Sequence, residues 1–158
     1  MKIIKITQGF EAIIDDDDFE KFGKFKYHIS KGKYAMRALP RTNGEKRNKR
    51  IKLHQDIIGK KEGFVIDHIN GNGLDNRKCN LRHCTISQNE MNSPAQRNKT
   101  GKYKGVYKTS GKCSTFFSTI FRDGKVYRIG SFRDELSAAK AYDLKAKELF
   151  GEFAKTNF

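Results

Sequence analysis

Three kinds of side chain in the middle of the sequence could together hydrolyse a phosphate ester. Asp67-His68 follows a short apolar run, Asn80 lies twelve residues after His68, and Asn89 lies nine residues further on. A histidine titrates near neutral pH and can take a proton from water. A carboxylate and an amide oxygen are hard ligands that suit Mg²⁺, which offsets charge on a phosphate and its leaving oxygen.

The elements around these residues must hold them rigidly. The run 64–66 predicts a buried strand, 70–76 a loop rich in Asn and Gly, and 81–84 a second strand. Residues 85–88 have the T-x-x-Q form of a capping box and open a helix that ends before Pro94. Neighbouring strand residues point to opposite faces, so Asp67 and His68 can share one site only at an irregular strand end.

The stretch VIDHINGNGLDNRKCNLRHCTISQNEMN resembles the HNH endonuclease motif, in the form found in phage and intron-encoded homing endonucleases. The family's His-Asn-Asn positions fall on His68, Asn80 and Asn89, and its metal-binding acid falls on Asp67. The resemblance implies a ββα-metal nuclease core with one Mg²⁺ or Mn²⁺ per active site. It assigns catalytic roles to His68, as general base, and to Asn80, which would brace the loop and orient His68. Asp67 and Asn89 would be the metal ligands.

The same resemblance implies hydrolysis of double-stranded DNA, by a nick or a double-strand break, that leaves 5′-phosphate and 3′-hydroxyl ends. The zinc-binding Cys pairs of some HNH proteins are absent, so structural zinc is not expected. Cys79, Cys84 and Cys113 are interpreted as ordinary free thiols.

The charge distribution favours a polyanionic partner. The net charge is +15, and it is concentrated in two flanks: residues 1–63 hold 16 Lys and Arg against 9 Asp and Glu, and residues 99–158 hold 13 against 6. The centre, 64–98, holds 4 against 3 and is nearly neutral. Two basic flanks around a neutral centre suggest grips on either side of a reactive site.

The C-terminal flank predicts a small α+β unit. Runs 103–108, 116–121 and 126–129 read as strands, and 134–150 reads as a helix with one apolar stripe and Gly151 just beyond its end. Strand alternation directs one set of side chains towards the helix, namely Val106, Ile120, Tyr127 and Ile129. The alternate set faces outward and comprises Tyr107, Thr119, Phe121 and Arg128.

The strings YKGVY, RIGSF, SAAKAYD and FGEFAKTNF of this flank resemble the Apetala/ethylene-response-factor DNA-binding domain. In that family a three-stranded antiparallel sheet, backed by one helix, lies in the major groove. Matching positions give the DNA-binding candidates Lys104, Tyr107, Lys108, Thr119, Lys125 and Arg128. The chain lacks the family's outward Trp, and its first turn differs in length, so base specificity does not transfer.

The N-terminal flank reads as a β-rich leader region that loosely resembles the leader of many phage HNH proteins. Runs 1–7 and 10–14 predict a hairpin, and 25–30 and 34–39 predict further strands. The acidic run 15–18 is interpreted as a helix start with solvated charges rather than a metal site. The basic loop 41–50 suits phosphate contact or a solvated hairpin tip. His54 either touches a phosphate or caps a helix entry.

Together these patterns predict an α+β chain with a leader at 1–63, a nuclease core at 64–98 and a DNA-binding domain at 99–158. The expected partner is double-stranded DNA, with no membrane and no protein partner. The apolar patches at the start are too short for a signal peptide, so a cytoplasmic, DNA-associated place in a bacterial or phage-infected cell is expected. The alternative is a DNA-binding regulator that no longer cuts, which would not need all four central residues. RNA fits less well, because a sheet suits the wide major groove of B-form DNA.

Overall fold

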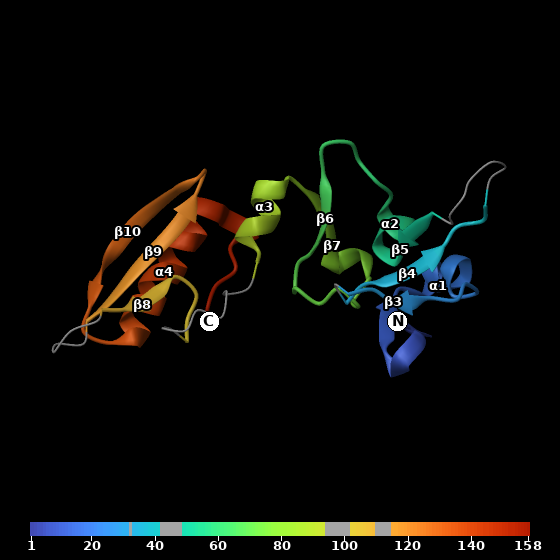
Figure 1. Cartoon of the computed structure of the whole chain (residues 1–158), viewed down its shortest axis with the longest axis horizontal. Coiled ribbons are helices and arrows are strands. Elements are labelled where there is room, and N and C mark those ends of the chain that lie inside the picture. The colour runs from blue at the N-terminus through green and yellow to red at the C-terminus, as the bar shows by residue number, and fades with distance from the viewer. Residues whose placement is uncertain (32, 42–48, 94–101, 110–114) are drawn as a thin grey trace. The chain divides into compact units, whose positions relative to one another are not determined.

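The computed structural model describes residues 1–31, 33–41, 49–93, 102–109 and 115–158 (Figure 1). Most of the basic loop 41–50, the linker that follows Ser93, and Cys113 lie outside these residues. The chain packs as two compact units, Met1–Thr85 and Ile86–Phe158. The predicted α+β class with small antiparallel sheets is confirmed, whereas the three-region division at residues 63 and 98 stays a prediction.

In its described residues, the first unit has three small sheets and two short α-helices. Its first hairpin pairs β1 (Lys2–Lys5) with β2 (Glu11–Ile14), and α1 (Asp16–Phe22) follows at once. A second sheet has the order β3 (His28–Ile29), β4 (Ala35–Ala38) and β5 (Arg50–Lys52). The chain then forms α2 (Leu53–Ile58) and the antiparallel pair β6 (Val65–His68) and β7 (Leu81–Cys84).

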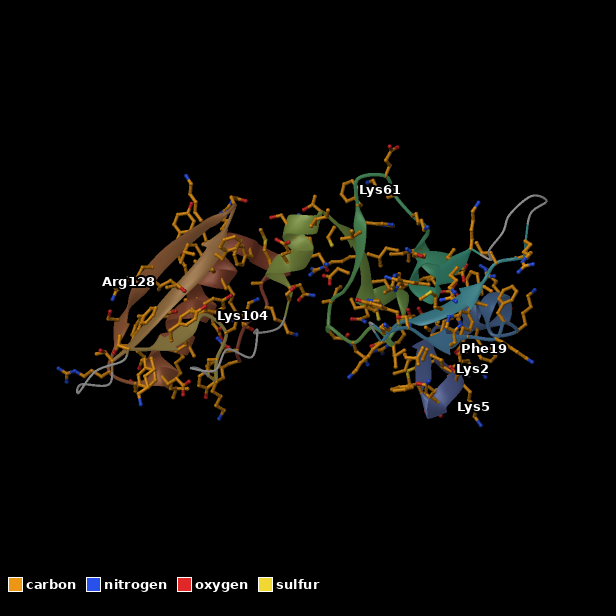
Figure 2. All side chains as sticks on the ribbon, viewed as in Figure 1. Lys2, Lys5, Phe19, Lys61, Lys104 and Arg128 are labelled. Carbon is orange, nitrogen blue, oxygen red and sulfur yellow. The ribbon has the colours of Figure 1, made fainter. Side chains whose placement is uncertain are left out.

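The core of the first unit draws on the leader and on α2. Its buried members are Ile4, Ile6, Ala12, Ile14, Tyr27, Ala35 and Leu53. Phe19 of α1 packs against this cluster, whereas Lys2 and Lys5 of β1 are exposed (Figure 2). Because alternate residues of β2 are buried here, the β2 backbone is held by the core and can anchor neighbouring loops.

The second unit begins with the short helix α3 (Ile86–Met91). Its sheet has the order β10-β9-β8, from β8 (Val106–Lys108), β9 (Phe116–Arg122) and β10 (Lys125–Phe132). Helix α4 (Glu135–Phe150) covers one face of this sheet (Figure 1). The strands β9 and β10 extend beyond the predicted runs, because the turn at Asp123-Gly124 joins them with little interruption.

Packing between sheet and helix follows the predicted stripe. Ile120, Tyr142, Ala146 and Phe150 form one buried cluster, and Val106 packs with Ala138 and Ala139 in another. Gly105 permits this close approach, since its φ is +72° and a Cβ there would lie 2.1 Å from the Tyr142 ring. Tyr127 pairs with buried Ile120 but stays 47% exposed, so α4 covers it only in part.

Candidate active site

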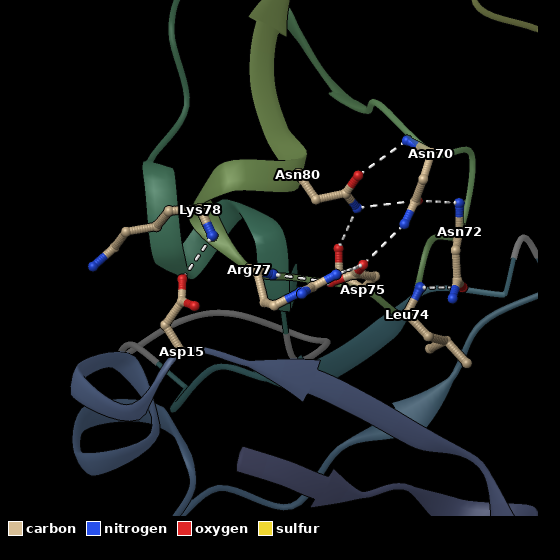
Figure 3. Close-up of polar contacts among 8 residues, drawn as sticks. All are labelled: Asp15, Asn70, Asn72, Leu74, Asp75, Arg77, Lys78 and Asn80. Carbon is tan, nitrogen blue, oxygen red and sulfur yellow. Dashed lines mark hydrogen bonds and ion pairs between the residues drawn. The ribbon is translucent and has the colours of Figure 1, made fainter. Parts of the chain in front are cut away.

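Strand β6 ends at His68, and the loop that follows is braced by its own side chains (Figure 3). The Asn80 amide donates to Asn70 Oδ1 at 3.1 Å and to the Asp75 carbonyl at 2.7 Å, while its oxygen accepts from the Asn70 amide N–H at 3.0 Å. Asn70 Nδ2 donates to Asp75, whose carboxylate also receives the Arg77 guanidinium at 2.7 Å. Asn80 therefore joins Asn70 to Asp75 within this loop, and its catalytic role stays a prediction.

Residues of the leader, in β2 and at the start of α1, hold this loop in place. Ile13 of β2 donates to the Leu74 carbonyl at 2.9 Å, and its own carbonyl accepts from the Asn76 N–H at 2.8 Å. Asp15 accepts the Lys78 N–H at 2.8 Å, and the Lys78 ammonium lies 3.0 Å from the Asp18 carboxylate. The expectation that the whole acidic run is solvated was wrong: Asp18 is only 2% exposed, because it faces the loop.

Asp67 is a buried carboxylate held by an arginine on the paired strand. Its residue is 5% exposed, and Arg82, its cross-strand neighbour, donates from Nε to Oδ2 at 2.9 Å. Within the part of the chain that the structure describes, no three His, Cys, Asp or Glu side chains are grouped as a metal site. A cation held with few protein ligands suits Mg²⁺, which keeps most of its waters. The Asp67 carboxylate is a hard oxygen donor that fits Mg²⁺ or Mn²⁺.

His68 lies in a buried cluster of rings and an amide. The imidazole of His54 contacts it edge-on at 5.0 Å between ring centroids, and the Tyr34 ring lies 5.7 Å away. Asn76 Oδ1 lies 3.5 Å from His68 Nε2. Burial lowers the pKa of His68 below its ordinary value, and the contact with Asn76 opposes this in part. The ring is therefore neutral at neutral pH, as a general base must be.

Asn76 was missed in the sequence as a member of this cluster, and His54 was given other possible roles. Asn76 is one of several asparagines in the loop, and nothing in their spacing marks the one that reaches the imidazole. His54 sits at the start of α2 and is 4% exposed, so it neither faces solvent nor caps a helix. The sequence singled out His54 by its position just upstream of the HNH-like stretch, but gave no signal that the side chain is buried.

The remaining candidates belong to the second unit. Asn89 lies on α3, and the structure does not relate it to Asp67. Lys104 donates from Nζ to the carbonyls of Met91 at 2.9 Å and Ser93 at 2.7 Å, so it caps the C-terminal end of α3. Burial, followed by repulsion from Lys155, lowers the pKa of Lys104 to about 8. Its ammonium group therefore holds the helix that carries Asn89.

The outer face of the β8-β9-β10 sheet carries most of the other DNA-binding candidates. Tyr107 stacks on Phe117 at 5.3 Å between ring centroids, and the Arg128 guanidinium lies 5.8 Å from the centroid of the Phe117 ring. Arg128 is labelled on this sheet in Figure 2. Thr119 pairs with Arg128 across the strands, and Phe121 is 59% exposed. Lys108 and Lys125 are exposed at strand ends. An apolar hollow of about 590 Å³ lies over this face.

Comparison with known proteins gives one matching family and two similar proteins. The sequence profile of a family described as HNH endonuclease matches residues 59–91. An uncharacterised HNH endonuclease of Acanthamoeba polyphaga mimivirus is 32% identical over 151 residues, which are 95% of this chain and 76% of that protein. Protein 3.8 of Escherichia phage T7 is 31% identical over 94 residues, which are 60% of this chain and 76% of that protein. The chain therefore belongs to the HNH endonuclease family of metal-dependent phosphodiesterases.

Proposed function

We propose that this protein is a homing-type endonuclease that cuts double-stranded DNA with His68 as its general base. One observation carries the proposal: a neutral, buried imidazole stands beside a buried carboxylate at the end of β6, on a loop braced from both sides. A neutral imidazole can accept a proton from water, and a rigid loop keeps it aimed at the reacting atom.

The other residues support that step in separate ways. Asp67 and Asn89 would hold one Mg²⁺ or Mn²⁺, and Arg82 holds the Asp67 carboxylate in a fixed position. The bound cation would offset negative charge on the phosphate and on the leaving oxygen. Asn80 would act through the loop by keeping the His68 end of β6 joined to the start of β7, where Ile69 N–H donates to the Asn80 carbonyl at 3.0 Å.

The second unit would hold the DNA. Its outer sheet face combines exposed aromatic rings with basic side chains, a combination suited to phosphate and base contacts. We assign the DNA contact to Tyr107, Lys108, Thr119, Lys125 and Arg128. Lys104 would support this unit as the cap of α3. No helix among the described residues has the length and apolar character that a membrane crossing needs.

Cleavage of supercoiled plasmid tests the proposal. Purified protein should nick or linearise the plasmid with Mg²⁺ or Mn²⁺ and stop in EDTA. His68→Gln should lower the rate by roughly 10²–10⁴-fold, the usual contribution of a general base. His83→Gln is the matched control, because His83 lies on the neighbouring strand and its Nε2 lies 3.1 Å from the Gly59 carbonyl oxygen. Equal loss in both variants would remove His68 from its proposed role, and metal-independent binding without cleavage would favour a DNA-binding regulator.

A further inference from the structure

The side chain that faces the His68 ring nitrogen is Asn76, two residues beyond Leu74 in the loop. Asn76 is 1% exposed, and its Oδ1 lies 3.5 Å from His68 Nε2. The rings of His54 and Tyr34 contact other parts of the imidazole. The imidazole is therefore confined by two rings and approached at one nitrogen by an amide.

The chemistry of a neutral imidazole makes this contact informative. One ring nitrogen carries a proton and the other carries a lone pair, and a hydrogen bond to one nitrogen selects between the two forms. Asn76 Oδ1 has no proton to donate, so a hydrogen bond between these two atoms requires the Nε2–H form of His68. In that tautomer Nδ1 carries the lone pair that can accept a proton.

Asn76 is rigidly held for such a task. Its N–H donates to the Ile13 carbonyl at 2.8 Å, and Asp75 forms a bridge to Ile13 beside it. The flanking β2 residues Ala12 and Ile14 are fully buried in the first core. A rotation of the Asn76 backbone would therefore have to disturb that core, so the amide oxygen is fixed relative to β6.

The buried Asn76 side-chain amide also lowers the stability of the fold. Asn76 Nδ2 is buried without a hydrogen-bond partner among the described residues. An unsatisfied buried donor costs about 1–3 kcal/mol, so an apolar side chain of similar shape would serve packing better. Residues that cost stability in this way gather at functional sites.

We propose that Asn76 is a positioning residue that fixes His68 in its Nε2–H tautomer and leaves Nδ1 as the proton acceptor. This proposal rests on the proposed role of His68 as general base. It assigns to Asn76 the orientation of His68 that the sequence had led us to expect of Asn80.

Nitrogen-15 NMR of the full-length protein tests the tautomer without any cleavage assay, because protonated and unprotonated ring nitrogens have distinct shifts and couplings. His68 should be in the Nε2–H form in the wild type. Asn76→Asp keeps an acceptor at the same place and should keep that form. Asn76→Leu has similar size but no acceptor, and its His68 should become a mixture of both tautomers. Asn72→Ala, in the same loop but exposed, is the control and should leave the His68 signals unchanged.

Plasmid cleavage then gives the second readout. Asn76→Leu should lower kcat by roughly ten- to hundredfold, the loss typical when an orienting partner of an active-site His is removed, with little change in KM. Asn76→Asp should recover most of that loss. An Nδ1–H tautomer in the wild type, or an unchanged tautomer and kcat in a folded Asn76→Leu protein, would overturn the proposal. If Asn76→Leu does not fold, the wild-type and Asn76→Asp spectra still decide. A failure of the wild type to cut DNA would count against the nuclease proposal and leave the tautomer result intact.

Discussion

Two neighbouring side chains at the end of β6 have different partners. The Asp67 carboxylate is held by the Arg82 guanidinium at 2.9 Å, whereas His68 is surrounded by two rings and an amide. Burial therefore keeps the imidazole neutral, while the carboxylate has a cationic neighbour. The proposed base and the proposed metal ligand thus stand at adjacent positions with different partners.

The proposed metal ligands can be tested by their effect on the Mg²⁺ requirement. Asp67→Asn keeps an acceptor for Arg82 but weakens a hard anionic ligand, and Asn89→Ala removes an amide oxygen. Each should raise the Mg²⁺ concentration for half-maximal cleavage by roughly tenfold or more. Asp123→Asn makes the same chemical change at an exposed turn and should have no effect. An unchanged Mg²⁺ requirement in both site variants would place the metal elsewhere.

His54 predicts acid sensitivity of the fold. Burial, with repulsion from His68 and Lys52, lowers the pKa of His54 to about 3, and its Nδ1 has no hydrogen-bond partner among the residues that the structure describes. The unfolded chain binds this proton near pH 6.5 and the folded chain does not, so the stabilisation is complete above pH 6.5 and is lost as pH falls towards 3. Between pH 7 and 5 the free energy of unfolding should fall by about 2 kcal/mol from His54 alone.

Urea unfolding at pH 7 and pH 5 measures this effect. His54→Phe keeps a ring between Tyr34 and His68 but cannot titrate, so its free energy of unfolding should change less with pH than that of the wild type. The difference between the two proteins isolates His54, because His68, whose pKa is also lowered, is present in both. An equal pH dependence in both proteins would show that His54 is accessible to protons in the folded state.

At the scale of elements, the leader and the active-site loop form one structure. The loop contacts β2 through backbone hydrogen bonds and α1 through Asp15 and Asp18. In the second unit, Lys104 plays a comparable part by joining the end of α3 to the approach to β8. Short elements with little core of their own are thus held by side chains from other elements.

The contact between α1 and the loop can be tested within the acidic run itself. Asp15→Ala removes the acceptor of the Lys78 N–H and should lower the free energy of unfolding by about 1 kcal/mol. It should also speed amide hydrogen exchange at Lys78 and lower the rate of plasmid cleavage. Asp17→Ala is the matched control, because the Asp17 side chain is 81% exposed and lies 3.9 Å from the Lys78 ammonium. Equal hydrogen exchange at Lys78 in the two variants would contradict this role of α1.

At the scale of the whole molecule, local patterns were predictable and distant contacts were not. Alternating apolar residues and turn signals predicted β6, β7, the C-terminal sheet and α4 within a few residues. For α2 the sequence indicated only a possible helix entry near His54 and no bounds, because its short run of apolar and polar residues gives no helical period. The Lys78 contacts with Asp15 and Asp18 join residues about sixty positions apart, and only the folded chain brings such residues together. That Asn76, and not another Asn of the loop, lies next to His68 also depends on how the folded chain brings these residues together.

The final prediction concerns which surface holds DNA. Lys125 and Arg128 lie on β10, whereas Lys140 and Lys147 are exposed on α4, which covers the opposite sheet face. Replacing either pair with Gln removes two positive charges from the same unit. If β10 contacts two phosphates, only the Lys125→Gln, Arg128→Gln protein should lose about 1.8 from the slope of log K against log salt, since each contact contributes about 0.9. Fluorescence anisotropy with one labelled duplex at several salt concentrations measures both slopes. Equal slopes would mean that charge acts at long range, and that Lys125 and Arg128 of β10 do not contact phosphates.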